Sequence, residues 1–147
     1  MVLCIAIGNP LRGDDGVARR ALQLLPSTEQ VRKLEVIQLM PENAPNIAAA
    51  HAVIFLDADA SATEVKLETL GKAPRYSAPL THSVNPFELL EMARQLYGFT
   101  GEAIFCHIPA SKFDPAEELT REAEEAAGSA ARLIGERLSQ MAAPSGS

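Results

Sequence analysis

Apolar and polar residues alternate along the chain in blocks that predict strands and helices in turn. Residues 2–7 are all apolar and lead into a Gly-Asn-Pro turn, which predicts a strand buried on both faces of a sheet. Residues 14–25 place their apolar side chains on one stripe, which predicts an amphipathic helix that ends at Pro26. Alternation over residues 34–40 predicts a second strand, and residues 41–50 have the pattern of a short helix.

The middle of the chain predicts a central strand followed by an edge strand. Residues 52–57 comprise five apolar positions and then an aspartate, which is typical of a buried strand. Residues 64–70 alternate strictly, which predicts an edge or antiparallel strand with one face in water. A loop rich in Pro, Ser and Gly follows over residues 71–81.

The last third of the chain predicts two helices separated by a strand. Residues 86–97 predict a helix that begins with a proline and is followed by the cap residue Gly98. Residues 102–108 predict a strand, and a long helix is expected from Asp114 to about Met141.

This order of elements predicts the architecture. Five strands with helices between them indicate an α/β fold, a three-layer α/β/α sandwich on a mostly parallel sheet. We expect one domain over residues 1–141 and a disordered tail over residues 142–147. The 147 residues are 47% apolar and 22% charged, which is enough for one buried core.

Charge and hydropathy exclude two classes of partner. The net charge is −6 and no cluster of Lys or Arg offsets it, so nucleic acid is not an expected partner. No apolar run approaches the roughly 20 residues of a membrane span, and residues 1–7 predict a strand and not a signal peptide. Cys4 and Cys106 each lie in an apolar run, which predicts buried, reduced thiols in a cytoplasmic protein.

The first candidate for chemistry is the turn over residues 8–16. In open α/β sheets, ligands bind at the carboxyl ends of the strands, where this turn is expected. Asp14 and Asp15 have the pattern of a helix cap, but one aspartate is enough for a cap and the other is then free at the mouth of a cleft. Two carboxylates repel phosphate, so this is not a phosphate loop.

Further candidates follow the central strand and the Pro-rich loop. Asp57 ends an apolar strand, where its charge needs water, a hydrogen-bond donor or a metal. Asp59 is expected in a turn or as a supporting residue, and His82 lies between a loop and a helix. His51 and His107 lie at or within strands and are expected to be structural.

One imidazole and two carboxylates would make a mixed nitrogen and oxygen site for a divalent metal. Imidazole suits zinc, copper, iron and nickel, and open coordination positions would suit hydrolysis or metal sensing. The chain has no Gly-x-Ser-x-Gly motif and no His-Glu-x-x-His motif, which excludes the commonest serine-hydrolase and zinc-protease patterns. The spacing alone leaves open whether Asp15, Asp57 and His82 converge.

Three segments, in the right order over about the first 110 residues, resemble the hydrogenase maturation proteases. Residues 7–17 resemble the signature Gly-Asn-x-Leu-x-x-Asp-Asp/Glu-Gly, which is specific. Residues 55–59 resemble a second motif, a strand that ends in Asp-Ala, and Thr81-His82-Ser83 resembles a third. Ala18, where many relatives have glycine, and the Pro-rich loop depart mildly from the pattern.

This resemblance implies a fold, a site and an activity. The fold would be phosphorylase/hydrolase-like with a twisted central sheet, and Asp15, Asp57 and His82 would be both the metal ligands and the catalytic residues. The activity would be an endopeptidase that removes the C-terminal extension of a [NiFe]-hydrogenase large-subunit precursor after nickel insertion. The precursor would contribute the nickel, and no organic cofactor would be needed.

Three other interpretations stay open at this point. A strand followed by Gly-Asn-Pro is similar to peptidyl-tRNA hydrolase, but the remaining motif of that family is missing and the net charge of −6 opposes tRNA binding. A non-catalytic nickel-binding scaffold would keep the same fold and ligands. An ordinary α/β domain would use the aspartates only as caps.

Overall fold

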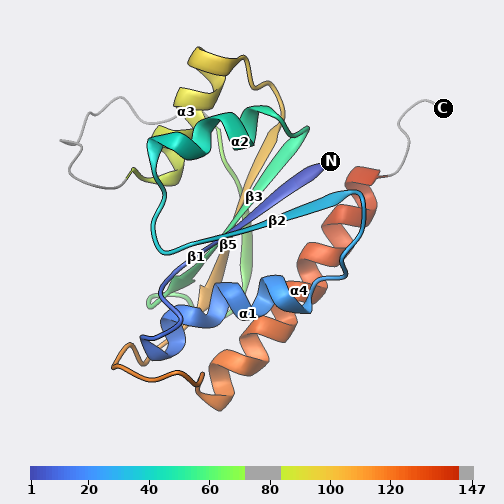
Figure 1. Cartoon of the computed structure of the whole chain (residues 1–147). Helices are drawn as coiled ribbons and strands as arrows, with labels where there is room; N and C mark the ends of the chain where they lie inside the picture. The colour runs from blue at the N-terminus through green and yellow to red at the C-terminus, as the bar shows by residue number, and fades with distance from the viewer. Residues whose placement is uncertain (72–83, 143–147) are drawn as a thin grey trace.

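One mixed sheet organises the chain (Figure 1). The computed structural model describes residues 1–71 and 84–142. The sheet order is β2-β1-β3-β5-β4, in which β4 is antiparallel to β5 and the other neighbours are parallel. The strands are β1 (Val2–Ile7), β2 (Val31–Val36), β3 (Ala52–Asp59), β4 (Lys66–Thr69) and β5 (Glu102–Pro109).

Helices cover both faces of this sheet, which confirms the predicted three-layer α/β/α sandwich. Helices α1 and α4 pack on one face, and α2 and α3 lie on the other, above the sheet in Figure 1. The helical elements are η1 (Gly13–Gly16), α1 (Val17–Leu24), η2 (Pro41–Asn43), α2 (Ala44–Ala48), α3 (Pro86–Tyr97) and α4 (Arg121–Ala142). None of the helices in the described ranges is long and apolar enough to cross a membrane.

Strand β1 shows why the apolar runs are continuous. Leu3 and Ile5 pack toward α2 and α3, whereas Cys4 packs toward α1 and α4. Both faces are therefore dry, as a parallel strand between two helix layers requires. Cys4 and Cys106 are buried and free, as predicted, and burial raises the pKa of each thiol to about 12.

Helix α3 has the predicted bounds, because its caps are encoded locally. Oδ1 of Asn85 accepts a hydrogen bond from the backbone N of Glu88 at 2.8 Å. Gly98 ends the helix in the left-handed conformation, with φ of 73°. The antiparallel edge strand β4 is confirmed as well.

Two predicted boundaries are wrong. The second strand covers Val31–Val36 and not residues 34–40, because its ladder with β1 fixes its length. The last helix begins at Arg121 and not at Asp114, because the backbone of residues 110–120 is held in an irregular course by the turn after β1. Residues 72–83, which include Thr81, His82 and Ser83, and the tail from residue 143 lie outside the described residues.

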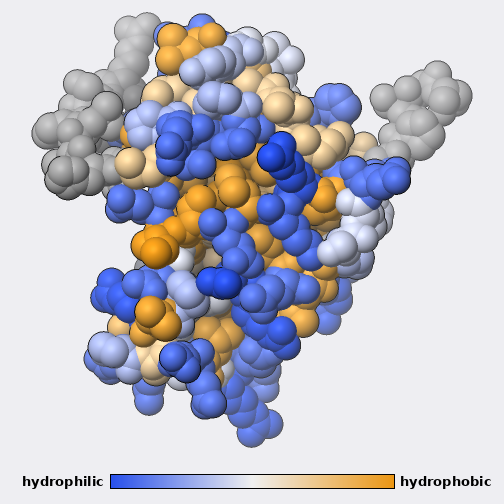
Figure 2. All heavy atoms as spheres, in the orientation of Figure 1, coloured by the Kyte–Doolittle hydropathy of each residue, from blue (hydrophilic) through white to orange (hydrophobic). Residues whose placement is uncertain are grey.

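The edge strand β2 leaves apolar side chains near water. Figure 2 shows a mainly hydrophilic face with a band of apolar atoms across its middle, where β2 lies in front in Figure 1. Ile37, directly after β2, is 67% exposed, and Leu11 in the turn after β1 is 61% exposed. Both lie at the carboxyl end of the sheet, where the candidate residues also lie.

Candidate active site

The predicted site residues that the structure describes lie where the order of the strands in the sheet reverses. From β1 the chain crosses through α1 to β2, then returns through α2 to β3 on the other side of β1. In open α/β sheets the loops on either side of such a reversal diverge, so the crevice in which a ligand is expected lies at the carboxyl ends of β1 and β3. Asp15 follows β1, and Asp57 lies near the carboxyl end of β3.

Asp15 is held close to the end of β1 by the conformation of Gly8. Oδ2 of Asp15 accepts a hydrogen bond from the backbone N of Asn9 at 2.6 Å. Gly8 has φ of 144°, and a Cβ at this position would collide with the backbone oxygen of Asp15. Only glycine fits there, so the signature glycine is needed to bring Asp15 over the strand end.

Asp14 does not cap the helix that follows it but binds backbone groups of a distant segment. Neither η1 nor α1 receives a side-chain cap, so the prediction that one aspartate caps its own helix is wrong. The carboxylate of Asp14, 1% exposed, accepts hydrogen bonds from the backbone N atoms of Ser111, Lys112 and Thr120 and from Oγ1 of Thr120, at 2.8–3.2 Å. Burial alone would raise its pKa, but these bonds outweigh burial and the pKa is lowered.

Gly13 allows this contact between distant segments. It has φ of 55°, and a Cβ on it would lie 2.7 Å from the backbone oxygen of Lys112. The backbone N of Gly13 donates to the oxygen of Ala116 at 2.8 Å. Hydrogen bonds therefore join the turn after β1 and residues 110–120 into one rim of the crevice, with Asp14 buried inside it and Asp15 half-buried beside the end of β1.

Asp57 is the most perturbed acid of the site. Burial raises its pKa to about 7, and the charges of Asp15 and Asp59 act in the same direction. A backbone hydrogen bond from Ala58 and the charge of His107 oppose this rise. Asp57 is the register neighbour of Ile7 on β1, and the carboxylate of Asp15 lies over Gly8 and Asn9, which follow Ile7 directly. The two predicted residues therefore lie at the carboxyl ends of neighbouring strands.

The third predicted ligand, His82, lies outside the described residues. Within residues 1–71 and 84–142, no group of three or more His, Cys, Asp and Glu side chains could hold a metal ion. Of the three predicted ligands, the structure describes the carboxylates Asp15 and Asp57. Carboxylates suit a divalent cation, and a cation beside Asp57 would favour the ionised form that burial, with a smaller effect of the charges of Asp15 and Asp59, disfavours.

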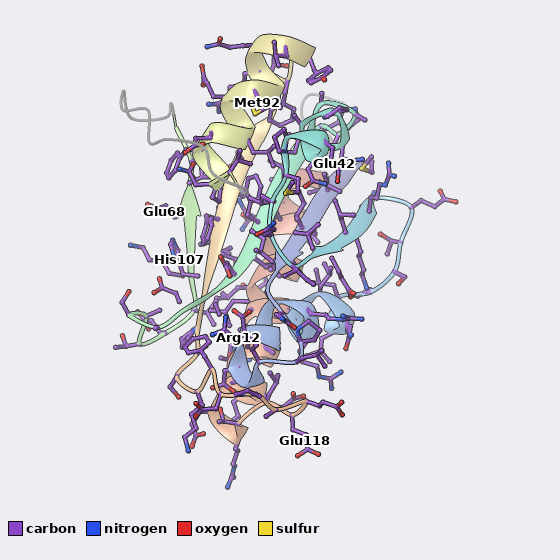
Figure 3. All side chains as sticks on the ribbon, turned by 60° about the vertical axis from the view of Figure 1, so that its left-hand side comes forward. Arg12, Glu42, Glu68, Met92, His107 and Glu118 are labelled. Carbon is purple, nitrogen blue, oxygen red and sulfur yellow. The ribbon has the colours of Figure 1, made fainter. Side chains whose placement is uncertain are left out.

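His107, which the sequence predicts to be structural, lies beside Asp57. His107 is the register neighbour of Asp57 across β3 and β5. Its Nδ1 lies 3.0 Å from Oδ2 of Asp59, and its Nε2 lies 2.9 Å from Oε1 of Glu68. Figure 3 shows His107 and Glu68 next to each other on β5 and β4. Strand alternation places residues 57, 59 and 107 on one face, but only the pairing of β3 with β5 makes them neighbours.

Of the two roles predicted for Asp59, that of a turn residue is wrong, because Asp59 is the last residue of β3. Its role as a supporting residue of the site stays a prediction. Hydrogen bonds from Oγ and the backbone N of Ser61, with that of His107, lower its pKa against a smaller effect of burial. Its carboxylate therefore stays ionised beside the imidazole.

Comparison with solved structures extends over nearly the whole chain. The hydrogenase maturating endopeptidase HybD from E. coli superposes with a TM-score of 0.75 at 17% identity, covering 96% of this chain and 93% of that one. The chain has the fold of the hydrogenase maturation peptidases. A [NiFe] hydrogenase maturation protease HycI from Thermococcus kodakarensis KOD1 gives 0.70 at 22% identity, with coverage of 94% and 92%.

A third structure agrees with the first two. The hydrogenase 2 maturation peptidase from Thaumarchaeota archaeon SCGC_AB-539-E09 gives a TM-score of 0.67 at 23% identity, over 94% of this chain and 97% of that one. No model of a known protein family matches the chain, and a comparison with curated protein sequences finds no match. At these identities the likeness defines the fold, and it agrees with the resemblance of the three sequence motifs.

Proposed function

We propose that the chain is an endopeptidase that removes the C-terminal extension of a [NiFe]-hydrogenase large-subunit precursor after nickel insertion. The observation that carries this proposal is the carboxylate pair Asp15 and Asp57 at the crevice of the sheet, in the fold of the hydrogenase maturation peptidases. Neighbours with this fold are named as peptidases and endopeptidases of hydrogenase maturation. We place the reaction in the cytoplasm, which the buried reduced thiols support.

The nickel of the precursor is the recognition element in this proposal. Burial, with a smaller effect of the charges of Asp15 and Asp59, favours the protonated form of Asp57. A cation presented by the substrate reverses this preference, because it attracts both carboxylates. The imidazole of His82 is the third proposed ligand. The carboxylate pair by itself is thus destabilised, and binding of the nickel-loaded precursor relieves it.

The chemical step is hydrolysis of one peptide bond. Nickel in the bound precursor would polarise the scissile carbonyl. Asp15, Asp57 and His82 orient the precursor around its metal, so that the scissile bond lies at the crevice between the loops after β1 and β3. Hydrogen bonds join residues 8–16 to residues 110–120, and this support would keep Asp15 in place when the substrate docks.

A processing assay with variants tests this proposal. Purified protein is mixed with nickel-loaded precursor, and the loss of the C-terminal peptide is followed by intact mass. We expect wild type to process the precursor and Asp57→Asn to be at least about 100-fold slower, because an amide is a poor ligand. Asp114→Asn, which changes an exposed acid that is not among the proposed ligands, is the matched control.

The outcomes separate the candidate functions. Full processing by Asp57→Asn would exclude the proposed role of the carboxylate pair. If wild type binds the nickel-loaded precursor but leaves its mass unchanged, a non-catalytic nickel-binding scaffold is the better description.

A further inference from the structure

Strand β2 is an open edge of the sheet. Among the strands of the described residues it pairs with β1 alone. The backbone N of Gly8 donates to the oxygen of Val36, which fixes the phase of this parallel ladder. Even-numbered residues of β2 therefore turn their backbone groups toward β1, and Lys33 and Glu35 turn theirs outward. No described residue outside the ladder binds the outward backbone groups of these two residues.

The charged side chains of β2 leave this edge accessible. Charges on an edge strand usually discourage the addition of another strand. Here Nζ of Lys33 donates to the backbone oxygen of Leu25, and the carboxylate of Glu35 lies 3.0 Å from Nε of Arg19 on α1. Both side chains are thus held over the face that α1 covers. The strand has six residues and no proline, so its backbone can pair along its whole length.

The opposite face of β2 indicates what kind of strand would fit. Leu34 and Val36 pack against the core beneath α2 and α3 but are only half-buried, in the apolar band of Figure 2. Arg32, on the same face by strand alternation, is exposed and forms no ion pair with any residue of the described ranges. A neighbouring strand with two apolar residues and one carboxylate on this face would complement all three side chains.

The carboxyl end of β2 leads to the proposed site. β2 lies beside β1, and the turn after β1 carries Asp15. A strand added to the outer edge of β2 would lie two strand spacings, about 10 Å, from β1, which about three or four extended residues span. Ile37, 67% exposed, follows β2 directly at this end. The tail of a precursor bound at the crevice can therefore reach β2 and run back along it.

We propose that the C-terminal extension of the precursor binds to β2 as an added antiparallel strand. This inference rests on the proposed function and names the surface that holds the part of the substrate to be removed. The outward backbone groups of Lys33 and Glu35 are the hydrogen-bond partners of the extension. Side chains at every second position of the extension lie beside Val36, Leu34 and Arg32 in that order. The first two of these positions are apolar, and the third carries a carboxylate.

Amide hydrogen exchange, resolved by residue with NMR, tests the added strand. The probe is a synthetic peptide with the sequence of the extension, titrated into the full-length protein. At saturation we expect exchange at Lys33 and Glu35 to slow at least about tenfold, because their N–H groups become bonded. Arg32 and Leu34, whose N–H groups already face β1, should change less than about twofold.

Two outcomes of this titration would overturn the added strand. One is exchange at Lys33 and Glu35 that no peptide concentration slows. The other is slow exchange of both residues in the free protein together with the mass of a dimer in sedimentation. That result would show that β2 pairs with a second copy of the chain.

A pair of variants tests the same surface in the reaction. Glu35→Pro and Glu35→Val both lack the carboxylate, but only proline lacks the backbone N–H, and an edge strand tolerates proline on its open side. We expect KM for nickel-loaded precursor to be at least about tenfold higher in Glu35→Pro than in Glu35→Val, with kcat within about threefold. Equal KM values would overturn the added strand and leave the proposed function intact. Failure of wild type to process the precursor would overturn the proposed function and this inference with it.

Discussion

At the scale of single residues, the ionised carboxylate of Asp57, which the proposed function needs, lowers the stability of the folded protein. Its pKa of about 7 lies above the ordinary 3.8, so the folded protein binds more protons than the unfolded chain between pH 4 and 7. Stability therefore falls as pH rises through this range, and the penalty is fully present above pH 7. We predict that Asp57→Asn raises the free energy of unfolding at pH 8 by about 2 kcal/mol, and far less at pH 5.

Urea denaturation at the two pH values measures this effect. An ordinary hydrogen-bonded aspartate would lose stability on the same substitution at both pH values. Such a loss would show that Asp57 is a structural residue, and the account of a strained carboxylate pair would be wrong.

Gly8 gives a second prediction at this scale. A methyl group on Gly8 would collide with the backbone of Asp15, so we predict that Gly8→Ala lowers the free energy of unfolding by more than about 3 kcal/mol. A methyl group on Gly128 in α4 would have nothing within 4 Å, and Gly128→Ala should instead stabilise by up to about 1 kcal/mol. Thermal denaturation compares the two. Equal and small effects would contradict the close approach of Asp15 to Gly8.

At the scale of elements, Asp14 joins the turn after β1 to the start of α4. We predict that Asp14→Asn lowers the free energy of unfolding at pH 7 by about 2–4 kcal/mol, because an amide would turn its NH2 group toward backbone N–H donors. Since the pKa of Asp14 is lowered, its stabilisation is present above about pH 4 and is lost as pH falls through the folded-state value. Chemical denaturation of the Asp14→Asn and Asp114→Asn proteins measures this effect. A loss of less than about 0.5 kcal/mol in Asp14→Asn would contradict the proposed role of the Asp14 hydrogen bonds.

The same contact explains which elements the sequence could predict. Helix α3 has Asn85 and Gly98 as local caps, so its bounds follow from neighbouring residues. The start of α4 depends on Asp14, which is more than 100 residues away, and the bounds of β2 depend on its ladder with β1. Long-range contacts of this kind leave no local signal, and the predictions fail there by three to seven residues.

The residues of the site also divide into those that the sequence could predict and those that it could not. Asp15 and Asp57 could be predicted because each follows a strand with a recognisable turn or apolar run. His107 could not, because its position inside β5 is that of an ordinary strand residue. Its partners Asp59 and Glu68 come from β3 and β4, and only the sheet order places them around it.

At the scale of the whole molecule, the proposed site lies at one end of the sheet. Residues from β1, β3, β4 and β5 meet at the carboxyl ends of the parallel strands, over the face that α2 and α3 cover (Figure 1). The exposed apolar residues Leu11 and Ile37 lie at this same end. A protein substrate can therefore contact apolar surface and the carboxylate pair at once.

Nickel dependence of processing tests the central claim most directly. The protein is incubated with nickel-loaded and with nickel-free large-subunit precursor, and the intact mass of each precursor is followed with time. We predict that only the nickel-loaded precursor loses its C-terminal peptide, because its metal is the group that Asp15 and Asp57 bind in the proposed site. Equal cleavage of both precursors, or of neither, would contradict the account.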